Sequence, residues 1–312
     1  MSVYRLGILG TDRRAAALRA RLAPGSPFAF GDFRLADKCA AADWSDTISD
    51  QAIDAIYLGC LPDQRAAIAV AALSAGKAVL TALPLAKTVA DLAAISAAAV
   101  AGNAPLLVTT DLRCTLAGRS LLAMRMAGDL GRLHSIYLAS RWAQANDHQT
   151  AADRHSERLW EAVEFILALA GEAPSRLFAI EGGAAPGGPL VLLNARFPSG
   201  TIGTGEVGAI LPKPAPVHDP ETEIEVAGTL AAVRCEPYRE AVQITGCVGS
   251  GKPLTVATSW HNDPVINMLA DLAELMAGRP VASAIGPDSL QQLLLAMAAV
   301  ESSLTGGAAV RL

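Results

Sequence analysis

Short apolar runs alternate with segments of helical spacing along the N-terminal third of the chain. The apolar runs predict strands at residues 4–9, 28–30, 54–59, 78–80 and 106–110. Apolar residues at intervals of three and four predict helices at 14–22, 66–75 and 89–101. Strands that alternate with helices in this way are typical of a parallel sheet covered by helices on both faces. We therefore expect the chain to open with a parallel α/β domain.

The pattern changes after residue 112. Helices are expected at 120–127, 157–169, 267–276 and 289–302, and strands at 133–140, 190–197, 200–207, 223–227, 231–234 and 241–245. Residues 143–158 are polar and are expected to form a loop. Short strands between Gly/Pro-rich turns predict an open, mainly antiparallel sheet. The chain is thus expected to consist of one domain over residues 1–112 and a second α/β domain over 113–312.

The composition is apolar enough that a membrane location has to be considered. Of the 312 residues, 52% are apolar and only 4% are aromatic, and the mean hydropathy is +0.34. No apolar run reaches the roughly 18 residues of a membrane-spanning helix. The richest stretch, 85–107, is interrupted by Lys87, Asp91, Asn103 and Pro105, and Arg5 interrupts the N-terminus early. We therefore expect a soluble, cytoplasmic protein without a signal peptide.

Charge and cysteine content exclude several classes of partner. The net charge is −5, and no basic stripe with interleaved aromatic residues is present, so we expect no nucleic-acid partner. The five cysteines are scattered without a C-x-x-C spacing, which predicts neither a zinc site nor a disulfide framework. The histidines have no matched spacing, and we expect no metal.

The first turn between a strand and a helix is where a dinucleotide would bind in a parallel α/β domain. Its sequence is Gly10-Thr11-Asp12-Arg13-Arg14-Ala15, against the Rossmann fingerprint G-x-G-x-x-G/A. The first and third fingerprint positions fit, but Asp12 replaces the middle glycine. Its carboxylate would oppose a diphosphate, or it would cap the following helix in the place of the phosphate. Arg13 and Arg14 are candidates to offset its charge.

An acidic residue about 20 positions after the first glycine often binds the ribose of the dinucleotide. Asp32 lies 22 residues after Gly10 and fits this spacing, and Asp37 is the alternative if the second strand lies later. Both residues also suit a solvated turn, and Gly10 suits a tight turn that the fold alone requires.

Several ordered motifs resemble those of the Gfo/Idh/MocA oxidoreductase family. They are the glycine turn at Gly10, Leu61-Pro62-Asp63, Ala75-Gly76-Lys77-Ala78-Val79-Leu80, Ala82-Leu83-Pro84, Gly128-Asp129-Leu130-Gly131-Arg132, Ile224-Glu225-Val226-Ala227-Gly228-Thr229-Leu230 and Gly278-Arg279-Pro280. The resemblance extends along the whole chain. It implies an N-terminal Rossmann domain and a C-terminal domain that binds a small-molecule substrate and pairs through its open sheet into a homo-oligomer.

The resemblance also implies a cofactor, NAD or NADP, and residues that contact it. These candidates are Gly10, Thr11, Asp12, Arg13, Arg14, Asp32, Pro62 and Pro84, and Arg113 is a candidate for substrate binding. The choice between NAD and NADP stays open, because the 2′-phosphate of NADP could be bound by Arg13, Arg14 or Arg34. Because of Asp12, it also stays open whether any cofactor binds.

The positions that carry catalysis in the family hold different residues in this chain. The Lys of the E-K-P turn is Leu83, with Ala82 in place of Glu, and the His after the P-N turn is Ala66. The D-x-G-x-H-x-x-D motif falls on Glu157, Leu159, Glu161 and Glu164, so that Glu161 replaces the acid–base His.

Three residues are candidates to replace the missing groups: Glu161, Glu164 and His155. The two glutamates would otherwise form a solvated or salt-bridged helix face, with Arg154 or Arg158 as partner, and His155 would be a surface residue. Two functions therefore remain open: an NAD(P)-dependent oxidoreductase with atypical catalytic residues, or a non-catalytic relative retained for binding, sensing or assembly.

Overall fold

The computed structural model describes residues 4–23, 33–35, 44–60, 62–143, 148–182, 190–211, 221–238, 241–246, 254–257 and 263–312. The chain forms two compact units. The first comprises Met1–Cys114 with Asp263–Gln291, and the second comprises Thr115–Asn262 with Gln292–Leu312. This division is discontinuous, whereas the sequence suggested a single boundary. A cofactor domain over 1–112 and a substrate and oligomerisation domain over 113–312 stay predictions.

The first unit is built on a parallel sheet with the strand order β2-β1-β3-β4-β5. Its strands are β1 (Tyr4–Gly10), β2 (Phe33–Leu35), β3 (Ala55–Gly59), β4 (Ala78–Ala82) and β5 (Leu106–Thr109). Every residue of β3 and β4 is buried, as the continuous apolar runs predict for strands covered on both faces. The predicted α/β class and parallel sheet are confirmed.

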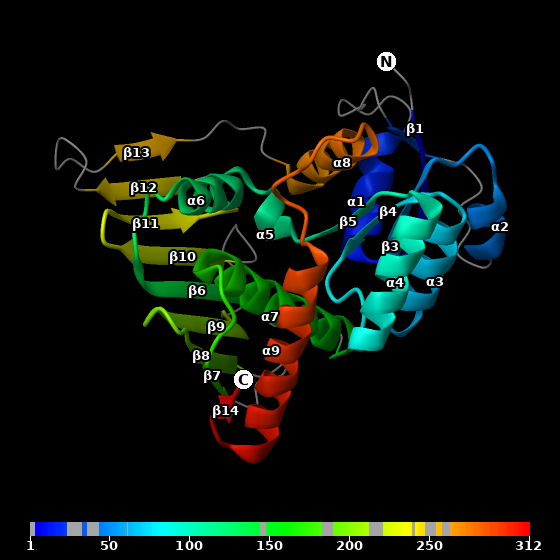
Figure 1. Cartoon of the computed structure of the whole chain (residues 1–312). Helices are drawn as coiled ribbons and strands as arrows, with labels where there is room; N and C mark the ends of the chain where they lie inside the picture. Colours follow the sequence, from blue (N-terminus) through cyan, green and yellow to red (C-terminus); the bar gives the residue numbers. More distant parts are fainter. Residues whose placement is uncertain are drawn as a thin grey trace. The chain divides into compact units, whose positions relative to one another are not determined.

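Helices cover both faces of this sheet (Figure 1). They are α1 (Arg13–Leu22), α2 (Trp44–Ser49), α3 (Pro62–Ser74), α4 (Val89–Gly102), α5 (Asp111–Cys114) and α8 (Pro264–Met276). Helices α1 and α8 share one apolar core with β1, in which Leu6, Leu18 and Met268 are fully buried. Helices α3 and α4 pack against each other, and Gly102 of α4 lies so close to the backbone of Leu73 that no side chain fits there.

The second strand lies later than the sequence predicted. Residues 28–30 are outside the described residues, and β2 at Phe33–Leu35 pairs in parallel with the start of β1. Asp32 and the alternative, Asp37, both lie outside the described residues.

The second unit contains a nine-stranded sheet with the order β13-β12-β11-β10-β6-β9-β8-β7-β14. The strands are β6 (Leu133–Ala143), β7 (Arg176–Gly182), β8 (Leu190–Arg196), β9 (Ile202–Leu211), β10 (Glu221–Gly228), β11 (Ala231–Glu236), β12 (Ala241–Gly246), β13 (Leu254–Ala257) and β14 (Val310–Arg311). Of the described strand pairs, β6 with β9 is parallel and all others are antiparallel. The mainly antiparallel sheet is thus confirmed.

One face of this sheet packs against α7. The helices of the second unit are α6 (Leu116–Ala127), α7 (His148–Ala170) and most of α9 (Pro287–Gly306). A side chain on Gly203 of β9 would collide with Ile166 of α7, so the strand residues on the same face as Gly203 point toward α7. The register of the neighbouring strands then places Ser140, Trp142 and Thr222 on that face as well.

The loop predicted at 143–158 is wrong for most of its length, because α7 begins at His148. The segment 148–158 contains no glycine or proline and is rich in residues such as Ala, Gln, Glu and Arg that form helices readily. Its polarity therefore does not interrupt the helix, and His155 lies on α7 and not in a loop.

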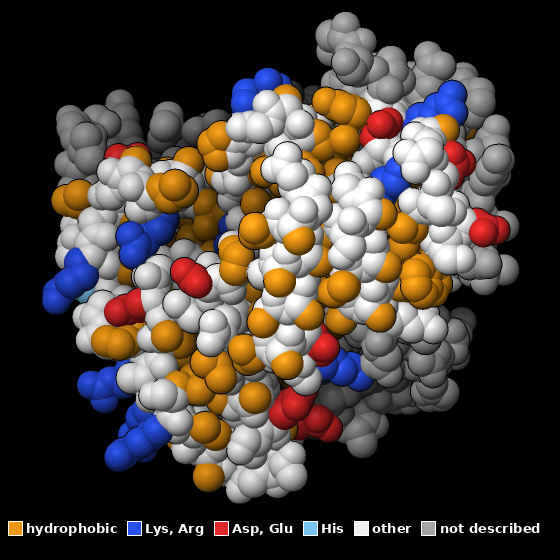
Figure 2. All heavy atoms as spheres, turned by 45° about the vertical axis from the view of Figure 1, so that its right-hand side comes forward, with side chains coloured by type: hydrophobic (Ala, Val, Ile, Leu, Met, Phe, Trp, Pro, Cys, Tyr) orange, Lys and Arg blue, Asp and Glu red, His pale blue; other side chains and the backbone are white. Residues whose placement is uncertain are grey.

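No described helix is both long and apolar enough to span a membrane. On the face drawn in Figure 2, apolar side chains form separate patches, and the Lys and Arg side chains are scattered among acidic ones.

Candidate functional site

The carboxyl ends of β1, β3, β4 and β5 meet at one edge of the first sheet. The strand order reverses between β1 and β3, and the crevice at such a switch point is where open α/β sheets bind ligands. Gly10 ends β1 and Gly59 ends β3, and the two residues are paired directly across the strands. The residues around this pair form the candidate site.

Gly10 is required by the fold itself. Its φ is +125°, and a Cβ there would lie 2.0 Å from the carbonyl carbon of Gly59 and 2.1 Å from its oxygen. Any other residue would collide with backbone, which cannot move aside as a side chain can. The glycine at the first fingerprint position therefore does not by itself indicate a bound nucleotide.

Asp12 is the N-cap of α1, which was one of the two alternatives drawn from the sequence. Its Oδ1 accepts a hydrogen bond from the backbone N–H of Ala15 at 2.7 Å, and its Oδ2 accepts one from the hydroxyl of Tyr57 at 2.8 Å. A Cβ built on Gly59 would lie 2.7 Å from Oδ1. The carboxylate therefore lies directly over Gly59, at the switch point.

Arg65 of α3 lies beside Asp12 and is almost completely buried. Its Nη2 is 4.0 Å from Oδ2 of Asp12. Its Nε donates to the carbonyl of Cys60 at 2.8 Å, and its Nη1 donates to the carbonyls of Pro84 at 2.9 Å and Ala82 at 3.3 Å. Sequence reasoning missed Arg65, although it is the one cation of an otherwise mainly apolar helix.

Tyr57 keeps its proton at neutral pH and therefore acts as a donor to Asp12. Burial raises the pKa of the Tyr57 hydroxyl well above its usual value, and the nearby Asp12 carboxylate raises this pKa further. Burial also raises the pKa of the Cys60 thiol, which lies at the same edge. Neither group is prepared to act as an anion.

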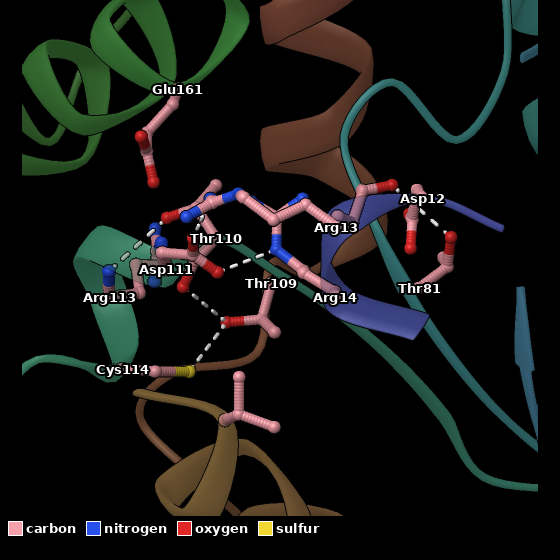
Figure 3. A network of polar contacts seen from close by, with 12 residues as sticks. Asp12, Arg13, Arg14, Thr81, Thr109, Thr110, Asp111, Arg113, Cys114 and Glu161 are labelled. Carbon is pink, nitrogen blue, oxygen red and sulfur yellow. Dashed lines mark hydrogen bonds and ion pairs between the residues drawn. The ribbon is translucent and has the colours of Figure 1, made fainter. Parts of the chain in front are cut away.

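Arg13 and Arg14 point toward Asp111 at the end of β5 (Figure 3). Nη2 of Arg13 and Nε of Arg14 each lie 2.5 Å from a different oxygen of this carboxylate. The side chain of Arg13 is 55% exposed, whereas those of Arg14 and Asp111 are 5% and 6% exposed. The two cations expected to offset Asp12 thus pair with a different carboxylate.

The segment after β5 is held by contacts with residues 282–283. Thr109 donates to the carbonyl of Ser283 at 3.0 Å, and its hydroxyl lies 3.4 Å from Sγ of Cys114 (Figure 3). Arg113 is buried and donates from Nη1 to the carbonyl of Ala282 at 3.2 Å. Substrate binding by Arg113 stays a prediction.

The residues at this edge do not fit the diphosphate of a dinucleotide. A diphosphate at the start of α1 needs free backbone N–H groups and a glycine that admits it. In this chain Asp12 stands at the glycine position, and its carboxylate accepts from the Ala15 N–H. A diphosphate bound at that point would lie against the Asp12 carboxylate, and the two negative charges would repel each other.

The other cofactor candidates are placed as follows. Thr11 is exposed between β1 and α1, and Pro62 begins α3, though its side chain is not described. Pro84 follows β4 and is joined to Leu83 by a cis peptide bond. Cofactor binding by these residues stays a prediction. Among the described residues, no group of three His, Cys, Asp or Glu side chains could hold a metal ion.

In the second unit, Glu161 and Glu164 are buried on α7 and do not form a solvated face. Glu161 accepts a hydrogen bond from Arg158 at 2.6 Å, and both side chains are about 5% exposed. Arg158 also donates to the hydroxyl of Tyr238 at 2.9 Å, with its guanidinium carbon 5.4 Å from the centre of that ring. Glu161 thus forms an ion pair with Arg158, and catalytic roles for Glu161 and Glu164 stay predictions.

Within the part of the chain that the structure describes, four neutral side chains near α7 have buried polar atoms without a hydrogen-bond partner: Ser140 Oγ, Trp142 Nε1, His155 Nδ1 and Thr222 Oγ1. We refer to these four residues as the polar cluster. Ser140 and Thr222 are direct neighbours on β6 and β10, and the rings of Trp142 and His155 are 5.9 Å apart. Burial lowers the pKa of His155, against an opposing effect of Glu181, so its imidazole is neutral at pH 7. Sequence reasoning singled out only His155 among the four.

The fold and the site define a class of protein: an α/β chain whose first unit is a Rossmann-type domain and whose second is an open mixed sheet. Residues 14–110 match the oxidoreductase family with an NAD-binding Rossmann fold. The matched residues belong to the first unit, and the model is that of the Gfo/Idh/MocA oxidoreductase family. Over residues 14–110 the match is to the same family that the sequence motifs resemble.

Solved structures with the same fold cover nearly the whole chain. An oxidoreductase from Agrobacterium radiobacter in complex with NAD+, L-tartaric acid and magnesium is 15% identical, with 99% of this chain and 98% of that chain covered and a TM-score of 0.76. An aldose-aldose oxidoreductase from Caulobacter crescentus complexed with glycerol is 17% identical, with 99% and 100% covered and a TM-score of 0.76. A levoglucosan dehydrogenase in complex with NADH and levoglucosan is 18% identical, with 99% of both chains covered and a TM-score of 0.76. No curated protein matches the chain in sequence.

Proposed function

We propose that this chain binds a small polar molecule in its second unit and does not transfer hydride. The observation that carries this proposal is Leu83, which follows β4 at the position where the family resemblance expects a catalytic lysine. Leu83 is 3% exposed and packs as a core residue. A leucine can neither donate a proton nor stabilise the negative charge that develops on a substrate oxygen during hydride transfer.

The acid–base position on α7 supports the same conclusion. Its occupant, Glu161, is engaged with Arg158 through a charge-assisted hydrogen bond of 2.6 Å in a buried setting. The engaged oxygen of Glu161 has to give up this bond before it can exchange a proton with a substrate. Two of the positions that carry the family's chemistry are thus used for internal packing and pairing.

The polar cluster supports the binding part of the proposal. A buried polar group without a partner costs about 1–3 kcal/mol of folding free energy. Ser140, Trp142 and Thr222 are less than a tenth exposed, and each carries such a group on the sheet face that α7 covers. A bound molecule that exchanges hydrogen bonds with them would remove this cost.

A second candidate is an NAD(P)-dependent oxidoreductase that acts on a small molecule with atypical catalytic residues. It is favoured by the family match over residues 14–110 and by the neutral imidazole of His155, which could act as a base. In this case His155, Glu161 and Glu164 would replace the family's acid–base group. Whether NAD or NADP serves as cofactor would then depend on contacts of the ribose.

One experiment separates the two candidates. The purified protein is mixed with NADH, NADPH, NAD+ or NADP+ and with L-tartrate, glycerol or levoglucosan, the compounds bound by structurally similar proteins, and absorbance is followed at 340 nm. We expect no turnover with any pair. Saturable turnover that is lost in Glu161→Gln would contradict the proposal and support the oxidoreductase.

The binding part is tested on the same samples by thermal unfolding. A compound that raises the melting temperature of the unaltered protein should raise it less in Trp142→Phe, which removes the indole N–H from the polar cluster and keeps an aromatic ring. Trp44→Phe is the matched control, because Trp44 lies on α2 of the first unit and is 43% exposed. An equal shift in both variants would show that the ligand does not contact Trp142.

A further inference from the structure

Three side chains from three separate elements converge at the switch point of the first sheet. Asp12 precedes α1, Tyr57 lies in the middle of β3, and Arg65 lies in the first turn of α3. Tyr57 is fully buried, Arg65 is 7% exposed, and the Asp12 side chain is about one quarter exposed. We refer to these three residues as the Asp12 group.

The Asp12 carboxylate lies at the start of α1, where a phosphate binds in a dinucleotide site, and has the partners of a bound anion. One oxygen accepts from a backbone N–H in the first turn of α1, at the positive end of the helix dipole. The other oxygen accepts from the Tyr57 hydroxyl and faces the Arg65 guanidinium at 4.0 Å. A helix N-terminus, a neutral donor and a cation together form an anion site, and the chain supplies the anion.

Arg65 connects this anion to the neighbouring strands. Its Nε and Nη1 groups donate to carbonyls at the ends of β3 and β4, namely those of Cys60, Ala82 and Pro84. The start of α1 and the carboxyl ends of two strands are therefore held by one buried side chain. In a nucleotide-binding domain, the ligand bridges these same segments.

The Asp12 group also explains why Arg13 and Arg14 are directed elsewhere. The charge of Asp12 is met by Arg65 from α3, and the two arginines of α1 pair with Asp111. Each described carboxylate at this edge thus has its own cationic partner within the first unit.

We propose that the Asp12 group is a built-in replacement for the diphosphate of a dinucleotide, which keeps the first unit in its ligand-bound arrangement and excludes NAD and NADP. This inference concerns the first unit and does not rest on the ligand or the lack of turnover proposed above. It predicts that removal of the carboxylate both destabilises the unit and creates a site for an external diphosphate.

The test compares the unaltered protein with Asp12→Gly, which restores the glycine of the fingerprint. Thermal unfolding is followed with inorganic pyrophosphate or NADH, and NADH affinity is measured by fluorescence titration. The unaltered protein should show no shift with either probe. The ligand-free Asp12→Gly protein should unfold at a lower temperature, gain a saturable stabilisation by both probes, and bind NADH at least about tenfold more tightly than the unaltered protein.

The matched control is Thr88→Gly in the same unit. Thr88 caps α4 through a hydrogen bond from the N–H of Asp91 at 3.1 Å, so its loss removes a helix cap without altering the Asp12 group. It should lower the melting temperature without any gain of pyrophosphate or NADH binding. If both variants gained pyrophosphate and NADH binding equally, the cause would be their lower stability and not the loss of the Asp12 carboxylate. This result would overturn the proposal.

A second variant keeps the test decisive if Asp12→Gly does not fold. Asp12→Asn keeps an oxygen for the Ala15 N–H but removes the charge, and it should bind pyrophosphate more tightly than the unaltered protein. Tight NADH binding by the unaltered protein, or unchanged affinity in Asp12→Asn, would overturn the inference. If the unaltered protein binds NADH but shows no turnover, this inference fails while the proposed function stands. Failure of the inference can therefore be distinguished from failure of the proposed function.

Discussion

At the residue scale, Asp12 shows which interactions a sequence can and cannot predict. An aspartate directly before a helix is a local signal, and its hydrogen bond to the N–H three residues later follows from helix geometry. Its other partners, Tyr57 and Arg65, come from separate elements and are brought near only by the order of the strands. The cap could therefore be predicted, whereas the anion site around it could not.

Gly10 is a related case in which one residue satisfies two demands. A glycine before the first helix is expected both for nucleotide binding and for a backbone that passes too close to its neighbour. The close approach to Gly59 is sufficient to require it. The fingerprint glycine is thus maintained by the fold even where Asp12 occupies the place of the phosphate.

The depressed pKa of His155 predicts a pH-dependent stability. Because burial disfavours the imidazolium, the unfolded state takes up the proton first when the pH falls through about 6.5. The contribution of neutral His155 to the free energy of unfolding is thus fully retained above pH 6.5. It is lost as the pH falls from there toward the pKa of His155 in the folded protein, which is lower. We expect His155→Gln to lose less unfolding free energy than the unaltered protein between pH 7.5 and pH 5, measured by urea denaturation.

The control for this prediction is His134→Gln, because His134 is exposed on β6 in the same unit. It should leave the pH dependence of stability unchanged. If both variants show the same slope as the unaltered protein, the buried imidazole does not determine the acid sensitivity.

At the scale of elements, the hydrophobic pattern predicted most helices and strands to within a few residues. Buried strands such as β3 and alternating strands such as β8 have the clearest signals, because every residue or every second residue must be apolar. The first turns of α7 were missed, since polar residues with good helix propensity resemble a loop when only hydrophobicity is considered. In the sequence, the only sign of the buried ion pair between Arg158 and Glu161 is that the two residues are three positions apart.

The end of α7 depends on an arginine from another helix. Arg125 of α6 donates from Nε to the carbonyl of Leu169 at 2.7 Å and from Nη2 to that of Ala170 at 2.9 Å. The last carbonyls of a helix lack partners within the helix, and Arg125 supplies them. We expect Arg125→Ala to reduce the unfolding free energy by about 1–3 kcal/mol in urea denaturation.

A suitable comparison is Met126→Ala at the next position of α6, where the side chain is 79% exposed. Its effect should stay within about 0.5 kcal/mol, as for most surface substitutions. Equal losses in the two variants would argue against a specific role of Arg125 at the end of α7.

At the scale of the whole molecule, the sheet of the second unit leaves one face open. Ile180, Leu192 and Ile202 are more than a third exposed. Ile180 and Leu192 are paired across β7 and β8, and strand alternation places them opposite the face that α7 covers. We propose that a second copy of the chain covers this face. Leu192→Asp should then reduce the mass measured by light scattering from that of an oligomer to that of a monomer.

The control is Leu295→Asp on α9, where the side chain is 50% exposed. This change should leave the mass unchanged. A monomeric unaltered protein, or dissociation caused equally by both substitutions, would show that the open sheet face is not the interface.

The return of residues 263–291 to the first unit has a consequence for synthesis. Met268 and Leu272 of α8 belong to the same core as Leu6 and Ile8 of β1, yet the ribosome makes them more than two hundred residues later. While residues 115–262 of the second unit are translated, the nascent parallel sheet lacks α8, which shares this core with α1. The N-terminal unit therefore cannot complete its folding first, as domains usually do during translation. Until α8 is made, we expect its exposed apolar surface to be bound by chaperones.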